Sequence, residues 1–376
     1  MKIIPLISAT LCLMAVSCIS PFTPEIETQG SYLTVNGLIS DANRRYEIRL
    51  SLSRPLDETA AVVPATNALV SVTDDHGNNW TFTEEERGVY LSDSTLFTGI
   101  PGYVYTLRIE HDGRQYESDP CMLRPGSDID TIEWEIQERE VDASGKTEDV
   151  VRISLSSYDP EKDNSYFRWT FMETWEVQLP FTMLSYEKRV CWSSESSHSI
   201  LIANTEALSE DRVTDYTLAV IDNSTDRMQH RYSMLVNQYA INFDEYEFWD
   251  NVKKVSENTG GLYDVIPAAV PGNVRCTSDP DERVLGYFSV SGVSTDRIFI
   301  KRPLIISDTY AEICAEDTIP ANPNYPGLGL YVWAIIELEP FPGVFTWVIT
   351  SNIACSDCSY FASNVKPDYW DEGFRK

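Results

Sequence analysis

Length, composition and charge exclude several classes of protein. The chain has 376 residues, 43% of them hydrophobic, and 58 acidic against 29 basic side chains give a formal net charge of −29. A surface this acidic repels nucleic acid and anionic lipid headgroups, so no nucleic-acid partner is expected. The hydrophobic content excludes a disordered chain, and the length predicts two or three domains with a substantial core.

The first eighteen residues have the pattern of a secretory signal. One basic residue, Lys2, precedes the apolar run 3–16, which is too short and wrongly flanked to span a membrane. The run closes on "AVSC", which resembles the lipobox cleaved by lipoprotein signal peptidase. We therefore predict a lipoprotein signal peptide over residues 1–17 and lipidation of Cys18, whose acyl chains, palmitate among them, would anchor the chain in a membrane.

The residues after Cys18 are predicted to form a tether over 18–30, because they contain two prolines and little periodicity. Position 19 is isoleucine rather than aspartate, so the usual signal for inner-membrane retention is missing. Glu25 and Glu27 weakly resemble a signal for export to the cell surface. These features predict a lipid-anchored outer-membrane protein, on either the cell surface or the periplasmic face.

From Tyr32 onward, apolar and polar residues alternate with the period of β-strands. Turn residues such as Asp75-His76-Gly77-Asn78 and Asp112-Gly113 are suited to tight hairpins between these strands. Seven short strands in about ninety residues favour an immunoglobulin-like or fibronectin-like sandwich over residues 31–123. The seven predicted strands are residues 31–39, 45–53, 68–74, 79–83, 88–92, 103–110 and 114–118.

Proline, glycine and acidic residues in "PCMLRPGSDID" predict a domain boundary, and a second, larger β-rich domain is expected over residues 124–376. Within it, the alternation of Phe167, Trp169 and Phe171 predicts the buried face of a strand.

The segment "NFDEYEFWDNVKKVSENTGG" has helical periodicity, with Asn242 and Glu245 as a capping-box pair at its start, and predicts an inserted helix near 244–258. Tyr246 and Trp249 share the apolar face of this helix, whereas Phe248 falls outside it and is predicted to be exposed. Tyr246, Phe248 and Trp249 are therefore the candidate interaction residues.

Six cysteines remain when Cys12 and Cys18 are set aside. An even number in an exported chain favours disulfides, and a CxxC motif without a second close pair argues against a zinc ribbon. Whether Cys355 closes on Cys358 or on a distant thiol such as Cys314 stays open, and so do a redox role and a metal role. The six candidates for disulfides are Cys121, Cys191, Cys276, Cys314, Cys355 and Cys358.

Motifs of known enzyme classes are missing from the sequence. The four histidines are scattered, and there is no HExxH, G-x-S-x-G, P-loop or G-x-G-x-x-G motif. Among 58 carboxylates, a pair spaced like that of a glycosidase would arise often by chance. The turns "DPEKDN" (159–164) and "SDPDE" (278–282) offer oxygen ligands but lack a calcium-loop pattern, so solvated turns are favoured over Ca²⁺ sites. No catalytic residue, cofactor or metal site is predicted.

Several long motifs together resemble one family, named domain of unknown function forty-two forty-nine and found in Bacteroidota. They are "LTVNGLISD" (33–41), "TGGLYDVIPAAVPGNV" (259–274), "DPDERVLGYFSVSGVS" (279–294) and "CSDC" followed by "NVKPDYW" (364–370). The resemblance runs from the lipobox cysteine to the end of the chain. It implies an outer-membrane lipoprotein with an immunoglobulin-like N-terminal domain and a second β-rich domain, often encoded beside a TonB-dependent receptor, with no known enzyme activity or agreed ligand.

The leading hypothesis is a non-enzymatic accessory or ligand-binding partner of a TonB-dependent nutrient transporter, taking an unidentified small-molecule, peptide or glycan ligand. A second is a surface enzyme that acts on glycans through a carboxylate pair. A third is a structural or adhesive surface module. The strand-and-helix region 231–300 is the predicted partner surface.

Overall fold

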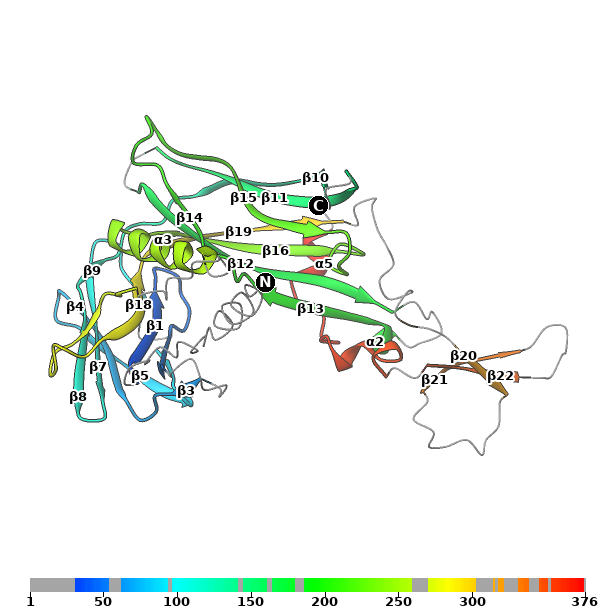
Figure 1. The fold of residues 1–376 in the computed structure, drawn as a ribbon, viewed down its shortest axis with the longest axis horizontal. Helices are drawn as coiled ribbons and strands as arrows, with labels where there is room; N and C mark the ends of the chain where they lie inside the picture. The colour runs from blue at the N-terminus through cyan, green and yellow to red at the C-terminus, as the bar shows by residue number, and fades with distance from the viewer. Residues whose placement is uncertain are drawn as a thin grey trace, which may run out of the picture.

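Most of the described chain forms two β-sandwiches that lie side by side, with a helix at their junction (Figure 1). The computed structural model describes residues 31–53, 62–93, 97–140, 145–160, 164–179, 186–258, 270–301, 314, 317–320, 331–337, 345–350 and 353–374. The predicted signal peptide, Cys18 and the predicted tether lie outside these residues. A mainly β fold with an inserted helix, as the sequence predicts, is therefore confirmed.

None of the helices in the described part of the chain combines the length and the apolar character required to cross a bilayer.

The first sandwich is a single continuous sheet of eleven strands that folds around one core. The strand order is β17-β8-β7-β4-β5-β6-β2-β1-β18, with β3 beside β2 and β9 beside β7. All seven strands predicted before residue 119 are present, and alternate residues along them enter one shared core. Its strands are β1 (Leu33–Ile39), β2 (Glu47–Leu52), β3 (Val63–Pro64), β4 (Leu69–Asp74), β5 (Asn79–Glu86), β6 (Val89–Leu91), β7 (Val104–His111), β8 (Arg114–Ser118), β9 (Cys121–Met122), β17 (Val274–Cys276) and β18 (Val284–Val290).

The first sandwich is not confined to residues 31–123, because the chain returns to it late. Strand β17 pairs with β8, and β18 pairs with β1 in parallel along its whole length, although both were predicted to belong to the second domain. Gly286 on β18 lies opposite Val35 and has a φ of +84°, and a Cβ atom there would lie 1.9 Å from the Val35 carbonyl oxygen. Only glycine allows this close pairing. The two sandwiches are thus tied together by three crossings of the chain.

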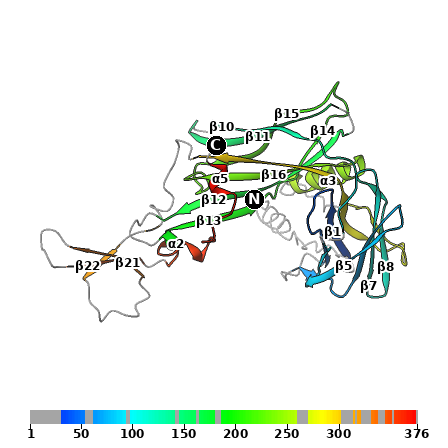
Figure 2. The ribbon, with the colours of Figure 1, turned by 180° about the vertical axis from the view of Figure 1, so that it is seen from behind.

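The second sandwich packs one sheet of three strands against one of five, as Figure 2 shows from behind. The first sheet has the order β10-β11-β15, and the second has the order β13-β12-β16-β19 with β14 beside β12. Phe167, Trp169 and Phe171 alternate into the core between them, as predicted from their spacing. The strands are β10 (Ile129–Glu140), β11 (Thr147–Asp159), β12 (Tyr166–Gln178), β13 (Val190–Ser196), β14 (Leu201–Asn204), β15 (Asp211–Asp222), β16 (Tyr232–Ala240) and β19 (Gly292–Ile300).

The C-terminal tail covers one end of the five-stranded sheet. Trp370 is fully buried against Trp192, and the backbone of Trp192 exchanges hydrogen bonds of 2.7 and 2.9 Å with Ser363. Helix α3 lies against the other end of β12, where it contacts Tyr166 and Arg168 (Figure 1). The remaining elements are helices α2 (Tyr186–Arg189), α3 (Phe243–Asn258), η1 (Ile353–Cys355), η2 (Cys358–Tyr360) and α5 (Trp370–Gly373), and a small sheet of β20 (Asp317–Pro320), β21 (Tyr331–Glu337) and β22 (Phe345–Thr350).

Candidate functional site

Helix α3 begins where the sequence predicts and lies at the junction of the two sandwiches (Figure 2). The backbone N–H of Glu245 donates to Asn242 Oδ1 at 2.8 Å, which caps the first turn. The predicted capping box is only half formed, because the Glu245 carboxylate turns into the protein rather than back toward Asn242. The helix start is thereby fixed, while the Glu245 side chain becomes part of the interior.

Two of the three candidate interaction residues pack against the second sandwich. The ring of Tyr246 lies 5.3 Å from that of Tyr166, and the ring of Trp249 lies 4.9 Å from the Arg168 guanidinium, both on β12. Tyr246 and Trp249 are half-buried, as expected of an apolar helix face. These residues attach α3 to the five-stranded sheet.

The prediction that Phe248 is exposed is wrong. Its side chain is 8% exposed, and its ring lies 4.9 Å from the ring of Tyr287 on β18. The reason is that α3 is covered from two directions, by β12 of the second sandwich and by β18 of the first. A residue outside the main apolar stripe is therefore buried as well, and Phe248 is not available to a partner.

Glu245 connects all three parts of the junction. Ser289 on β18 donates to its Oε1 atom at 2.6 Å, Trp249 Nε1 donates to it at 3.2 Å, and Arg168 Nε lies 3.6 Å away. Burial raises the pKa of Glu245, and Arg168 with the two hydrogen bonds opposes this shift only in part. A buried carboxyl group with a raised pKa thus holds the helix between the sandwiches.

Arg168 is the partner that the sequence analysis missed. It lies between Phe167 and Trp169, which point into the core, so its position on the strand predicts an outward, solvated side chain. Instead its guanidinium is 4.9 Å from the ring centroids of both Tyr239 and Trp249. Helix α3 covers this part of the sheet, and no local pattern in β12 signals that.

A cavity of about 230 Å³ lies beside this junction, between α3 and the first sandwich. Asp244 and Glu247 of the helix and Asp119 opposite give it a negative lining, and the Phe248 and Tyr287 rings form its apolar part. Such a lining suits a ligand group with a positive charge or several hydrogen-bond donors. The full lining is Asp119, Pro120, Cys121, Asn242, Asp244, Glu247, Phe248, Asn251, residues 270–273 and Tyr287.

Cys121, which lines this cavity, is a free thiol. Burial, and then the nearby Glu245 charge, raises its pKa to about 12, so it stays protonated at neutral pH. A neutral thiol is a poor nucleophile and a poor metal ligand. This residue therefore contributes to the shape of the cavity rather than to redox chemistry.

Four of the six candidate cysteines form disulfides. Cys355 bonds Cys314 and Cys358 bonds Cys191, so the CxxC motif does not close on itself. The prediction fails for Cys121 and Cys276, which are both buried and free. Cys276 on β17 is paired with Tyr116 of β8, whereas Cys121 belongs to the next strand, β9, and is paired with Tyr105 of β7. The two cysteines thus occupy different positions in the sheet, and a disulfide requires Cα atoms within about 7 Å.

Of the two turns predicted to be solvated, residues 278–281 are exposed and residues 161–163 lie outside the described part of the chain, while flanking acidic residues bind groups of the protein. Asp159 accepts a hydrogen bond of 3.0 Å from the Asn164 backbone, and Glu282 pairs with Arg114 at 2.9 Å. Among the residues that the structure describes, no three histidine, cysteine or acidic side chains gather as a metal site would require.

A pair of carboxylates does face across β12 and β13. Glu173 and Glu195 are directly opposite each other, and Arg227 lies between them, with its Nε atom 3.5 Å from Glu173 and an ion pair to Glu195. Tyr232 donates to Glu173 at 2.8 Å, and burial raises the pKa of Glu173. Because Glu173 is buried in the second sandwich and already bound on two sides, this pair does not present the open cleft of a glycosidase.

One family model matches the chain. It is described as "Domain of unknown function (DUF4249)" and covers residues 19–297, which include both sandwiches and α3. No curated protein matches the chain. Because the matched region is well over half of its length, the chain belongs to this family of proteins of unknown function.

Proposed function

We propose that this protein is a non-enzymatic accessory protein of the outer membrane, anchored by lipid on Cys18, which binds a ligand for a TonB-dependent nutrient transporter. The observation that carries the ligand-binding part is the cavity between α3 and the first sandwich. The lipobox-like "AVSC" sequence supports the anchor, and the family resemblance supports the transporter.

The size of the cavity limits what it holds. Small-molecule pockets commonly measure about 300–1,000 Å³, so a cavity of about 230 Å³ accommodates one group of a ligand rather than a whole large molecule. Asp244 and Glu247 would attract a cationic or donor-rich group, and Phe248 and Tyr287 would contact its apolar part. The rest of the ligand would remain outside, within reach of a second protein.

The partnership is tested by affinity purification of the epitope-tagged full chain after crosslinking in intact cells. We expect an outer-membrane barrel of the TonB-dependent class to be recovered with the parent chain. Replacing Cys18 with alanine removes the acyl anchor, so this variant should leave the membrane fraction and recover little of the barrel. Consistent failure to recover such a barrel with the parent chain would refute the partnership.

A further inference from the structure

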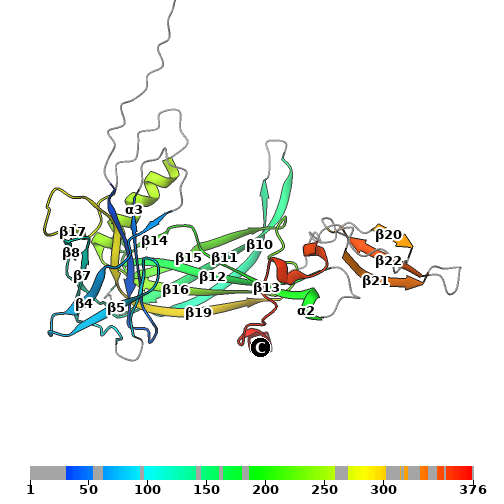
Figure 3. The ribbon, with the colours of Figure 1, turned by 90° about the horizontal axis from the view of Figure 1, so that it is seen from below.

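Strand β10 is an edge strand of twelve residues. Within the part of the chain that the structure describes, it pairs only with β11, and both of its faces are exposed over most of its length. Figure 3 shows the far end of the β10–β11 hairpin standing away from the body of the second sandwich. The open edge of such a strand presents backbone N–H and C=O groups that another strand can pair with.

Several of the usual protections of an edge strand are missing from β10. Residues 129–140 contain no proline and no lysine. The one irregularity in the pairing with β11 lies at the start of the strand, between Ile129 and Thr131, and the register is regular from there to Glu140. Short length, bulges, proline and charged side chains, lysine above all, are the common devices that prevent pairing at an edge, so along most of its length β10 keeps only its acidic charge. Most of β10 is thus a straight template.

The charge of β10 decides what kind of strand it accepts. Its single basic residue, Arg139, is paired with Glu148 at 2.5 Å and Asp222 at 2.7 Å. In a second copy of the chain the same acidic strand would face itself, and like charges opposite each other are unfavourable. A basic strand is the complementary partner. The acidic residues of β10 are Asp130, Glu133, Glu135, Glu138 and Glu140.

The two faces of β10 differ, which defines the pattern of the partner further. Trp134 lies opposite Ile153, on the core-facing side, yet Trp134 is 38% exposed and Ile136 is 41% exposed. Glu133 and Glu135 project from the other face. A partner strand would therefore alternate basic residues, next to the carboxylates, with apolar residues next to Trp134 and Ile136.

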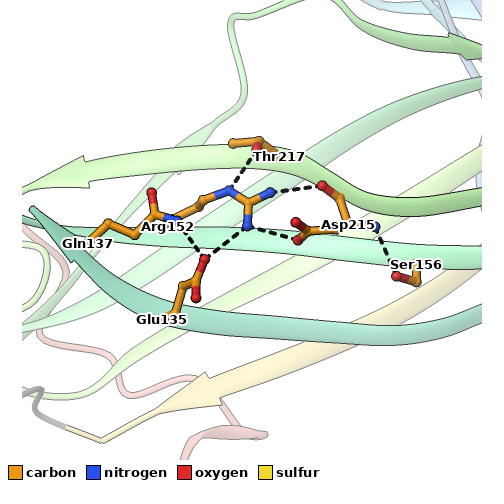
Figure 4. Close-up of polar contacts among 6 residues, drawn as sticks. All are labelled: Glu135, Gln137, Arg152, Ser156, Asp215 and Thr217. Atoms are coloured by element: carbon orange, nitrogen blue, oxygen red, sulfur yellow. Dashed lines mark hydrogen bonds and ion pairs between the residues drawn. The ribbon is translucent and has the colours of Figure 1, made fainter. Parts of the chain in front are cut away.

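An arginine holds this part of β10 in place. Arg152 of β11 donates to Glu135 of β10 at 3.1 Å, and to the Asp215 carboxylate and the Thr217 hydroxyl of β15, each at 2.8 Å. Figure 4 shows this side chain joining all three strands across one face of the sheet. Asp215 has a φ of +52° where the β11–β15 pairing is irregular, and Arg152 also bonds its carbonyl oxygen at 2.8 Å. The strand is thus ordered before any partner arrives.

We propose that the open edge of β10 binds an extended basic segment of another protein, which adds to the β10-β11-β15 sheet as a fourth strand. The inference goes beyond the proposed function, because it does not depend on a transporter or on the cavity at α3.

The test uses the full chain, purified in detergent, and a fluorescein-labelled peptide of about ten residues that alternates lysine and valine. A control peptide of the same charge has prolines in place of the two central valines, so it cannot form the ladder. We expect the first peptide to bind at least about tenfold more tightly at physiological salt, because simple attraction to an acidic protein is partly screened there. Hydrogen exchange should slow in residues 129–140 when it binds.

Two variants with the same change in net charge test whether the peptide binds at β10. Glu133→Lys should weaken binding about fivefold or more, because a cross-strand attraction becomes a repulsion. Glu110→Lys, on an exposed position of β7, should change it less than about twofold. Equal binding of both peptides, equal effects of both variants, or protection outside residues 129–140 would overturn the proposal. A dimer without peptide that protects the same amides would assign the edge to a second copy and overturn it too.

Discussion

Cys358→Ala is expected to lower the free energy of unfolding by about 4 kcal/mol under oxidising conditions. The Cys191–Cys358 disulfide joins β13 to η2 across a sequence separation of 167 residues, so it removes much conformational freedom from the unfolded chain. Beside it the tail is attached to the same sheet by noncovalent contacts, among them the packing of Trp370 against Trp192 and the backbone hydrogen bonds between Trp192 and Ser363. Loss of the bond should therefore weaken the docking of the tail as well as the second sandwich.

The matched control is Cys276→Ala, which removes a buried cysteine that forms no disulfide. It should cost about 1 kcal/mol, from lost packing alone. Urea denaturation of the three chains, with and without reductant, measures these differences. When both chains are measured with reductant, the parent and Cys358→Ala should have similar denaturation midpoints. Equal midpoints of the parent and Cys358→Ala without reductant would contradict the assigned pairing, as would peptide mapping that joins Cys355 to Cys358.

Glu245→Leu is expected to cost about 3 kcal/mol, because it leaves the buried Arg168 guanidinium without its carboxylate and removes the acceptor for Ser289 and Trp249. Glu245→Gln should cost about 1 kcal/mol, since the amide oxygen still accepts those hydrogen bonds. The comparison separates the hydrogen bonds from the charge. Equal losses in the two variants would show that the acceptor atom is not what holds the junction.

The pH dependence of the free energy of unfolding, compared between the parent and Glu245→Gln, tests the pKa shift of this carboxyl group. Because burial raises the pKa of Glu245 above its usual value of 4.5, the folded chain binds this proton more tightly than the unfolded chain does. The resulting stabilisation is fully present below pH 4.5 and is lost as the pH rises through the raised pKa. The parent should therefore lose stability relative to Glu245→Gln as the pH rises above 4.5. A difference that does not change with pH would contradict the assignment.

Local patterns in the sequence predict most of the strands and the helix, because apolar periodicity and turn residues determine these elements within segments of a few residues. The alternation of Phe167, Trp169 and Phe171 predicts the inner face of β12, and Asn242 predicts the start of α3. Four of the six candidate cysteines form disulfides, as predicted for an exported chain. The region 231–300 does contain the helix that forms the junction, which is where the candidate cavity lies.

Local patterns do not predict the contacts between segments that are far apart in the sequence. Strand β18 completes the first sandwich because Gly286 allows close parallel pairing with Val35. The sequence around residue 286 does not indicate that β1 is the strand with which it pairs. Phe248 was expected outside because the helix was considered alone, whereas Tyr287 covers it. Arg168 and Glu245 belong to two separate elements, and only the packing of α3 on β12 brings them together.

The measurement that tests the ligand-binding claim most directly is analysis of the solutes released from the purified complex of chain and transporter by mass spectrometry. The parent complex should release a solute with a cationic or donor-rich group. The double variant Asp244→Asn/Glu247→Gln, which changes only the charge of the cavity lining, should recover the same transporter with at least about tenfold less of that solute. Equal amounts of solute from both complexes would contradict a role for the cavity in binding.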